Sequence, residues 1–151
     1  RIRDEFADSN PTVSIAVECP ERRRVKADTR LELVLTELLR NAILHNDRSD
    51  LQITATVRPA TVEQTNTWVA IIIEDNGSGI PDHEKETLET GRETPLQHGT
   101  GLGLWLVHWT VDCFGGEVDI ETRGTGTSVT LRLLEAATPD EEADEGEASS
   151  A

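Results

Sequence analysis

The first third of the chain changes from a two-residue to a helical period of apolar positions. Residues 12–18 (TVSIAVE) alternate apolar and polar side chains, which predicts a strand. Asp28 is a good helix N-cap. The residues after it place apolar side chains at helical spacing in one stripe: Leu31, Val34, Leu35, Leu38, Leu39 and Ala42. The pattern predicts a helix that runs to about Asn46 with one buried face.

Two apolar stretches follow, at about 51–58 and 67–74, and predict two strands joined by a polar loop that contains Pro59. Residues 77–103 contain six glycines and two prolines but few large apolar side chains. This composition is typical of a mobile loop rather than of a core element.

The segment that begins at Gly101 is apolar on nearly all sides. One helical face carries Leu102, Trp105, Leu106, Trp109 and Cys113, and another carries Leu104, Val107 and Val111. Such a helix is expected to be buried, so both tryptophans are predicted to lie in the core, with the alternative that one of them faces a domain outside this chain. Gly115 and Gly116 are expected to end it. Residues 117–122 and 127–133 are then expected to form a hairpin around 123–126.

The order strand, helix, two strands, loop, helix, hairpin predicts an α/β fold. We expect a two-layer sandwich over residues 12–134, in which helices cover one face of a mixed sheet. Residues 135–151 carry seven acids, no base and no core residue, which predicts an acidic disordered tail. The chain begins with Arg1 rather than Met, so we expect it to be a piece of a larger protein.

The composition narrows the classes of function. The formal net charge of −15 argues against non-specific nucleic-acid binding. Of the 14 basic residues 12 are arginine, and an acidic, lysine-poor surface favours a halophilic protein from a salty cytosol. Two distant cysteines without CxxC spacing are expected to be reduced thiols in the cytoplasm. The longest aliphatic run, VAIII at 69–73, is far below the ~18 residues that span a bilayer.

Glu37, Asn41 and His45 follow one another at four-residue spacing on the predicted first helix. They therefore stack along one side of it, next to the apolar stripe. Polar residues at a helix edge are ordinary, so this group alone favours a solvated edge over a binding site.

Two glycine-rich stretches offer candidate ligand contacts. In EDNGSGIP (74–81), Asp75 ends a strand and can accept a hydrogen bond from an exocyclic amine, while Gly77 and Gly79 leave room for a flat ring. In HGTGLGLW (98–105), alternate glycines lead into a helix N-terminus, which favours phosphate. The second stretch is neither a dinucleotide-binding GxGxxG nor a GxxxxGK[ST] loop. Each stretch alone is equally compatible with a turn or a hinge.

In this combination and order, the motifs resemble the ATP-binding domain of sensor histidine kinases. That domain belongs to a wider family that includes gyrase, mismatch-repair and heat-shock chaperone ATPases. ELVLTELLRNAILHN is similar to the family's N box, EDNGSGIP to its first glycine box and HGTGLGLWLV to its second. GGEVDIETRGTGTSVTLRLL resembles its closing hairpin. The resemblance covers about 12–134 and implies the Bergerat-type ATP-binding fold.

The resemblance also implies ligands for ATP and Mg²⁺. Asn41 matches the asparagine that binds the Mg²⁺ bridging the phosphates, and Asp75 the aspartate that reads the adenine amino group. Gly77, Gly79 and Ile80 match the adenine pocket, and Gly99, Thr100, Gly101, Leu102 and Gly103 match the phosphate-binding second box. Residues 81–100 correspond to the lid that closes on ATP. His45 is a candidate phosphate contact, because Leu44 stands where many members have a lysine.

The activity implied is transfer of the ATP γ-phosphate to a histidine on a separate dimerisation domain, and from there to a response regulator. None of His45, His83, His98 and His108 lies in a context that resembles this acceptor. We therefore expect the acceptor domain upstream, with residues 1–11 as the end of its helical region. A homodimeric full-length protein and a cytoplasmic location of this part follow from the same resemblance.

Departures from the family pattern keep other functions open. Glu37 stands where many kinases have a second asparagine. In the ATPase branches a glutamate at this spacing activates water, so an ATPase or switch module with Glu37 as base is an alternative. In a kinase the same carboxylate would polarise the attacking imidazole. The lid has no phenylalanine, and Arg92 is its only arginine. A nucleotide-binding pseudokinase is a further alternative, against which Asn41, Asp75 and the second glycine box count.

Overall fold

The computed structural model describes residues 1–9, 12–44, 50–62, 66–77, 101–123 and 126–136. In chain order the elements are α1 (Ile2–Ser9), β1 (Ser14–Glu18), α2 (Arg30–Leu44), β2 (Gln52–Val62), β3 (Asn66–Asp75), α4 (Gly101–Cys113), β4 (Glu117–Arg123) and β5 (Gly126–Leu134). Among these elements no helix has the length and apolar character needed to cross a membrane.

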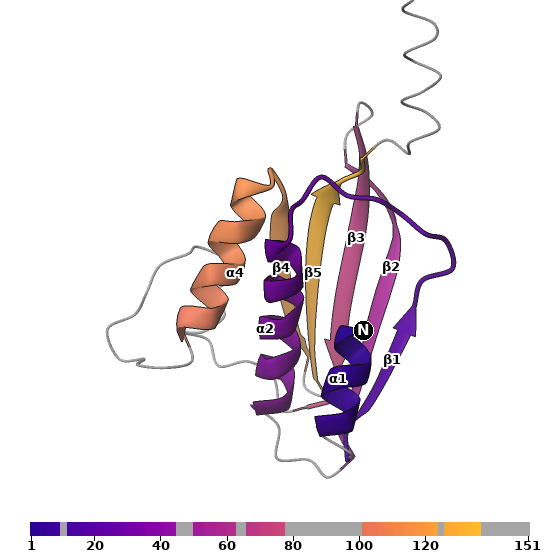
Figure 1. The fold of residues 1–151 in the computed structure, drawn as a ribbon, viewed down its shortest axis with the longest axis vertical. Helices are drawn as coiled ribbons and strands as arrows, with labels where there is room; N and C mark the ends of the chain where they lie inside the picture. The colour runs from indigo at the N-terminus through magenta and orange to yellow at the C-terminus, as the bar shows by residue number, and fades with distance from the viewer. Residues whose placement is uncertain (10–11, 45–49, 63–65, 78–100, 124–125, 137–151) are drawn as a thin grey trace, which may run out of the picture.

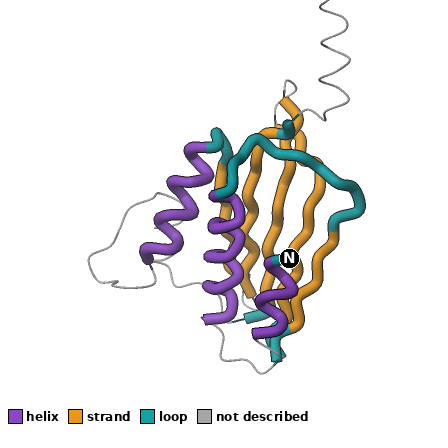
Figure 2. Tube along the Cα trace, in the orientation of Figure 1, coloured by secondary structure: helices purple, strands orange, loops and turns teal. Residues whose placement is uncertain are grey.

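The five strands form one mixed sheet in the order β1-β2-β3-β5-β4. β1 and β2 are parallel, whereas the other neighbouring pairs are antiparallel. Figure 1 shows α1, α2 and α4 on the same side of this sheet, and Figure 2 shows the two layers as helices and strands. The predicted two-layer α/β sandwich is therefore confirmed.

The core lies between the helices and the covered face of the sheet. The predicted stripe of the first long helix is confirmed, because Val34, Leu38, Leu39 and Ala42 are buried on α2. They pack in one cluster with buried residues of α4 and of the strands: Leu104, Val107, Val111, Ile71, Ile73, Ile120, Val129, Leu131 and Leu133. Alternate residues of β3 and β5 point to this face, as the period of a strand requires.

The prediction that both tryptophans of α4 lie in the core is wrong. Trp105 is 36% exposed and Trp109 is 44% exposed, and Cys113 is exposed as well. The rings of Trp105 and Trp109 meet edge to face, with centroids 6.3 Å apart. A two-layer sandwich lets a helix bury only one face against the sheet, and the face of Leu104, Val107 and Val111 takes that place. α4 therefore keeps an apolar outer surface.

The helix ends follow the local chemistry of the sequence. Asp28 Oδ1 accepts a hydrogen bond from the Arg30 N–H (2.8 Å), which confirms the predicted N-cap of α2. After α4, Gly115 has a φ of +73°. The N–H groups of Gly115 and Gly116 donate to the carbonyls of Asp112 (2.9 Å) and Val111 (3.0 Å), a Schellman motif. The two glycines therefore end α4 as predicted.

The residues that follow β5 show that the ordered chain continues to residue 136, beyond the predicted start of the acidic tail at residue 135. Glu135 donates its N–H to the Thr67 carbonyl (3.0 Å), and its carboxylate forms an ion pair with Arg23 (2.9 Å). Ala136 donates to the Arg24 carbonyl (2.8 Å). Backbone pairing thus holds the chain two residues beyond β5, because the segment after β1 crosses the end of the sheet there. The rest of the predicted tail lies outside the described residues.

The first residues form a helix that contacts this domain. Ile2 and Phe6 of α1 pack against the core cluster, and Arg1 forms an ion pair with Glu32 of α2. The predicted helical character of this segment is therefore present. Its origin in a preceding dimerisation domain stays a prediction.

Candidate functional site

The three predicted motifs lie on the same side of the molecule. α2 and α4 run in opposite directions, since Arg30 at the start of α2 lies over the Phe114 ring just beyond α4 (5.3 Å to the centroid). Figure 1 shows the last turn of α2, the end of β3 and the first turn of α4 at one end of the fold. The fold thus brings the N box and both glycine boxes to one end.

The N-box residues lie at the edge of α2 that adjoins the core. Asn41 is buried, with 8% of its surface exposed. The Glu37 side chain is 16% exposed, and its Oε1 accepts a hydrogen bond from Arg40 Nη1 (2.8 Å). A buried amide at this position is not the solvated helix edge that the spacing alone favoured. His45 lies outside the described residues.

Asp75 is the last residue of β3 and is held by the turn that follows. Its Oδ1 accepts the Gly77 N–H (2.9 Å), which fixes the carboxylate over a buried glycine. Asn76 Oδ1 accepts the Gln52 N–H (2.8 Å), and Asn76 Nδ2 donates to the Asp50 carbonyl (3.2 Å). These bonds tie the first glycine box to the start of β2.

Gly126, which the sequence did not single out, touches the backbone of Asp75. Its φ is +152°, and a Cβ built there would lie 1.9 Å from the Asp75 carbonyl oxygen. Only a residue without a side chain allows this approach. The first residue of β5 therefore positions the end of β3.

Thr127 is a second residue beside Asp75 that the sequence reasoning did not single out. It lies opposite Asp75 in the β3–β5 register and is buried. Its Oγ1 has no hydrogen-bond partner among the described residues. Burying a hydroxyl without a hydrogen-bond partner costs free energy. A polar ligand beside Asp75 could supply the hydrogen bond that the described residues do not provide. The residues present at the end of β3 and β5 therefore fit a hydrogen-bonding ligand such as a nucleobase.

The second glycine box enters the first turn of α4. Gly101, Leu102 and Gly103 are the first three residues of this helix. The first N–H groups of a helix have no partner within it and attract anions. Gly99, Thr100, Gly79, Ile80 and the predicted lid (81–100) lie outside the described residues.

The donor set also suits a hard cation held mainly by a nucleotide. Among the described parts of the chain, no group of three His, Cys, Asp or Glu side chains is arranged to hold a metal ion. Mg²⁺ usually keeps few protein ligands and takes the rest from phosphates and water. The amide oxygen of Asn41 is the group that fits this role.

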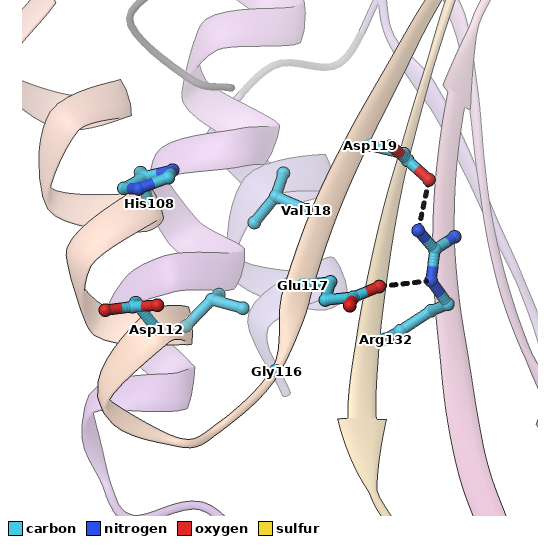
Figure 3. A pocket seen from close by; sticks show the side chains of 8 residues that line it. His108, Asp112, Gly116, Glu117, Val118, Asp119 and Arg132 are labelled. Carbon is cyan, nitrogen blue, oxygen red and sulfur yellow. Dashed lines mark hydrogen bonds and ion pairs between the residues drawn. The ribbon is translucent and has the colours of Figure 1, made fainter. Parts of the chain in front are cut away.

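Figure 3 shows a hollow at a different place, between α4 and the edge strand β4. It has a volume of about 270 Å³, and none of the predicted site residues lines it; its walls are His108, Val111, Asp112, Gly116, Glu117, Val118, Asp119 and Arg132. Arg132 forms ion pairs with Asp119 and, at 3.3 Å, with Glu117. Hydrogen bonds to Asp119 and, to a smaller extent, to Glu117 raise the pKa of the Arg132 guanidinium. This hollow is separate from the candidate site.

Comparison with solved structures supports the fold. The catalytic domain of the histidine kinase ThkA superposes with a TM-score of 0.71 at 25% identity, over 89% of this chain and 88% of that one. The mycobacterial sensor histidine kinase MprB gives a TM-score of 0.72 over 91% of this chain and 92% of that one, at 18% identity. The latter likeness concerns the fold alone.

Comparison with known sequences identifies the protein family. The C4-dicarboxylate transport sensor protein DctB of Rhizobium meliloti is 33% identical over 136 residues, which are 89% of this chain and 21% of the relative. The histidine protein kinase DivJ of Caulobacter vibrioides is 34% identical over 133 residues, 80% of this chain and 21% of the relative. The chain thus spans about a fifth of these relatives. Residues 26–137 match the family described as "Histidine kinase-, DNA gyrase B-, and HSP90-like ATPase", and the chain belongs to it.

Proposed function

We propose that the chain is the ATP-binding catalytic domain of a sensor histidine kinase. It binds ATP with Mg²⁺ and presents the γ-phosphate to a histidine on a separate dimerisation domain, from which a response regulator receives it. The observation that carries the proposal is the arrangement at one end of the fold: buried Asn41, Asp75 beside Thr127, whose hydroxyl has no partner within the described part of the chain, and the glycine-rich start of α4. Similarity to sensor kinases supports it.

In this proposal each residue has a simple task. Asp75, oriented by the Gly77 N–H, accepts the adenine amino group, and Thr127 donates or accepts one hydrogen bond beside it. The N–H groups of the first turn of α4 bind phosphate oxygens, and Gly101 and Gly103 let the ligand approach them. Asn41 supplies an amide oxygen to the cation. When bound, ATP·Mg²⁺ supplies the activated phosphoryl group, and the protein contributes alignment and charge neutralisation.

The acceptor and the remaining partners lie in other domains. A phosphoacceptor domain upstream, a homodimer in the full-length protein, a response regulator and a cytoplasmic site of action are all part of the proposal. The exposed Trp105 and Trp109, on the helix that starts at the second glycine box, offer such a domain an apolar surface. The acidic, lysine-poor composition supports the proposal that the domain works at high salt.

A second candidate function is an ATPase or switch module in which Glu37 is the base for water. The position of Glu37 one helical turn before the buried Asn41 favours it, because this places a carboxylate near the phosphates. Incubation with ATP and the isolated acceptor domain separates the two functions. A kinase labels a histidine, whereas the module releases inorganic phosphate without labelling.

Calorimetric titration with ATP and Mg²⁺ at high salt tests the proposal. Asp75→Asn removes the charge that accepts the adenine amine, so we expect the Kd to rise about 10- to 100-fold. Asp112→Asn is the matched control, since it makes the same exchange on α4 beside the separate hollow, and its Kd should equal that of the wild type. A folded wild-type protein that binds no ATP would overturn the proposal.

A further inference from the structure

The candidate base Glu37 is hydrogen-bonded to Arg40, a residue outside the motif positions that the family resemblance assigns to ATP and Mg²⁺. Arg40 Nη1 donates to Glu37 Oε1 at 2.8 Å. The Arg40 side chain is 54% exposed, whereas that of Glu37 is only 16% exposed. A guanidinium thus reaches from the solvent side of α2 to a carboxylate that is mostly covered.

Helix geometry gives this contact a direction. With about 100° between successive residues, Asn41 lies roughly 40° to one side of Glu37 around the helix, and Arg40 roughly 60° to the other side. Asn41 is on the side of the buried stripe. The bond to Arg40 therefore draws the Glu37 carboxylate away from Asn41, the predicted Mg²⁺ ligand.

This direction matters for the use of Glu37 as a base for water. To activate water, the carboxylate must reach a molecule in line with the γ-phosphorus and take its proton. The water oxygen would then bond to phosphorus as the bond to the β–γ bridging oxygen breaks. ADP would leave with that electron pair, and the proton would stay on Glu37. One of the two carboxylate oxygens instead accepts the Arg40 guanidinium N–H, which holds the carboxylate away from that position.

We propose that Arg40 is a positioning residue that restrains Glu37 and so suppresses ATP hydrolysis. The inference rests on the proposed function, since it assumes that ATP binds beside Asn41. It assigns to this chain a residue that limits the use of water as the phosphate acceptor. Arg40 acts through Glu37 and takes no direct part in the reaction.

The test compares phosphate release from ATP by the wild type, Arg40→Met, Glu37→Gln and the double variant. We expect Arg40→Met to raise hydrolysis by about threefold or more, because a freed base recovers part of its usual rate advantage. The double variant should lose this gain. Arg30→Met is the matched control: it removes an ion-paired arginine from the first turn of the same helix and should leave hydrolysis unchanged.

A second readout needs no nucleotide. In low-temperature ¹⁵N spectra, the Arg40 Nη signals should be separated from those of free arginines in the wild type and merge with them in Glu37→Gln. Unchanged or reduced hydrolysis in Arg40→Met, a gain that survives in the double variant, or Nη signals insensitive to Glu37→Gln would each overturn the inference. Calorimetry of the same samples separates the causes: without ATP binding the proposed function fails too, and with it only the role of Arg40 fails.

Discussion

Replacement of Gly126 by alanine tests how the end of β3 is held in place. In the structure this residue has a φ of +152° and lies against the backbone of Asp75. An added Cβ would stand 1.9 Å from the Asp75 carbonyl oxygen, whereas real Cβ atoms essentially never come within 3.0 Å of such a neighbour. Both atoms belong to paired strands, so no side-chain rotation relieves the overlap. One of the two strands must move by about 1 Å.

The size of the effect follows from two costs. Overpacking a closely packed site costs about 1–3 kcal/mol. A side chain in a rarely populated backbone region costs about 1–3 kcal/mol more, and partial relaxation brings the expected total to about 3 kcal/mol. If β3 is the strand that moves, Asp75 moves with it, and the proposed hydrogen bond to the adenine amine weakens as well. We expect the Kd for ATP to rise about tenfold or more.

Urea unfolding and calorimetric ATP titration measure the two effects on one sample. Gly115→Ala is the control, because Gly115 also has a positive φ (+73°) but the nearest atom to an added Cβ, Leu134 Cδ1, is 3.8 Å away. It should lose about 1 kcal/mol of stability and keep the wild-type Kd. A Gly126→Ala protein with the stability and ATP affinity of the wild type would refute the argument.

Two further predictions concern single polar groups. Thr127→Val removes a buried hydroxyl that has no partner among the residues the structure describes. Unfolding stability should stay equal or rise, while ATP affinity should fall about three- to tenfold; calorimetry showing unchanged affinity would exclude Thr127 from the site. Hydrogen bonds from Arg30 hold the pKa of Asp28 below its ordinary 3.8, so its stabilising charge is present above that pH and lost below it. Asp28→Asn, which keeps the cap, should melt lower than the wild type at pH 7, and the difference should shrink as the pH falls below 3.8. A pH-independent difference would contradict this.

Local patterns predicted the elements well where one side of an element is polar. The stripe from Val34 to Ala42 and the caps at Asp28 and Gly115 needed only neighbouring residues. α4 was different, because its sequence is apolar on both faces and gives no sign of which face meets the sheet. Trp105 and Trp109 were assigned to the core for this reason, and only the layer architecture shows that they are exposed.

The motifs of the candidate site can be recognised in the sequence, but the residues that support them cannot. Asn41, Asp75 and the start of α4 come to one end of the fold as the family resemblance implied. Gly126 acquires its role from a contact with Asp75, 51 positions away, which no local pattern encodes. Thr127 did leave a signal: the alternation in GTSVTLRLL puts it on the same face as Val129, Leu131 and Leu133. A hydroxyl on a core face is an anomaly that sequence reasoning can look for.

The exposed aromatic pair on α4 gives the protein an optical property. The chain has three tryptophans and no tyrosine, so indole dominates its near-ultraviolet absorption and emission. Trp105 and Trp109 stand edge to face at 6.3 Å, close enough for their electronic transitions to couple. Their helix starts at the second glycine box, and Trp105 lies in its second turn. A domain that covers this side of α4 will shift the emission to shorter wavelength, so docking can be followed without a label.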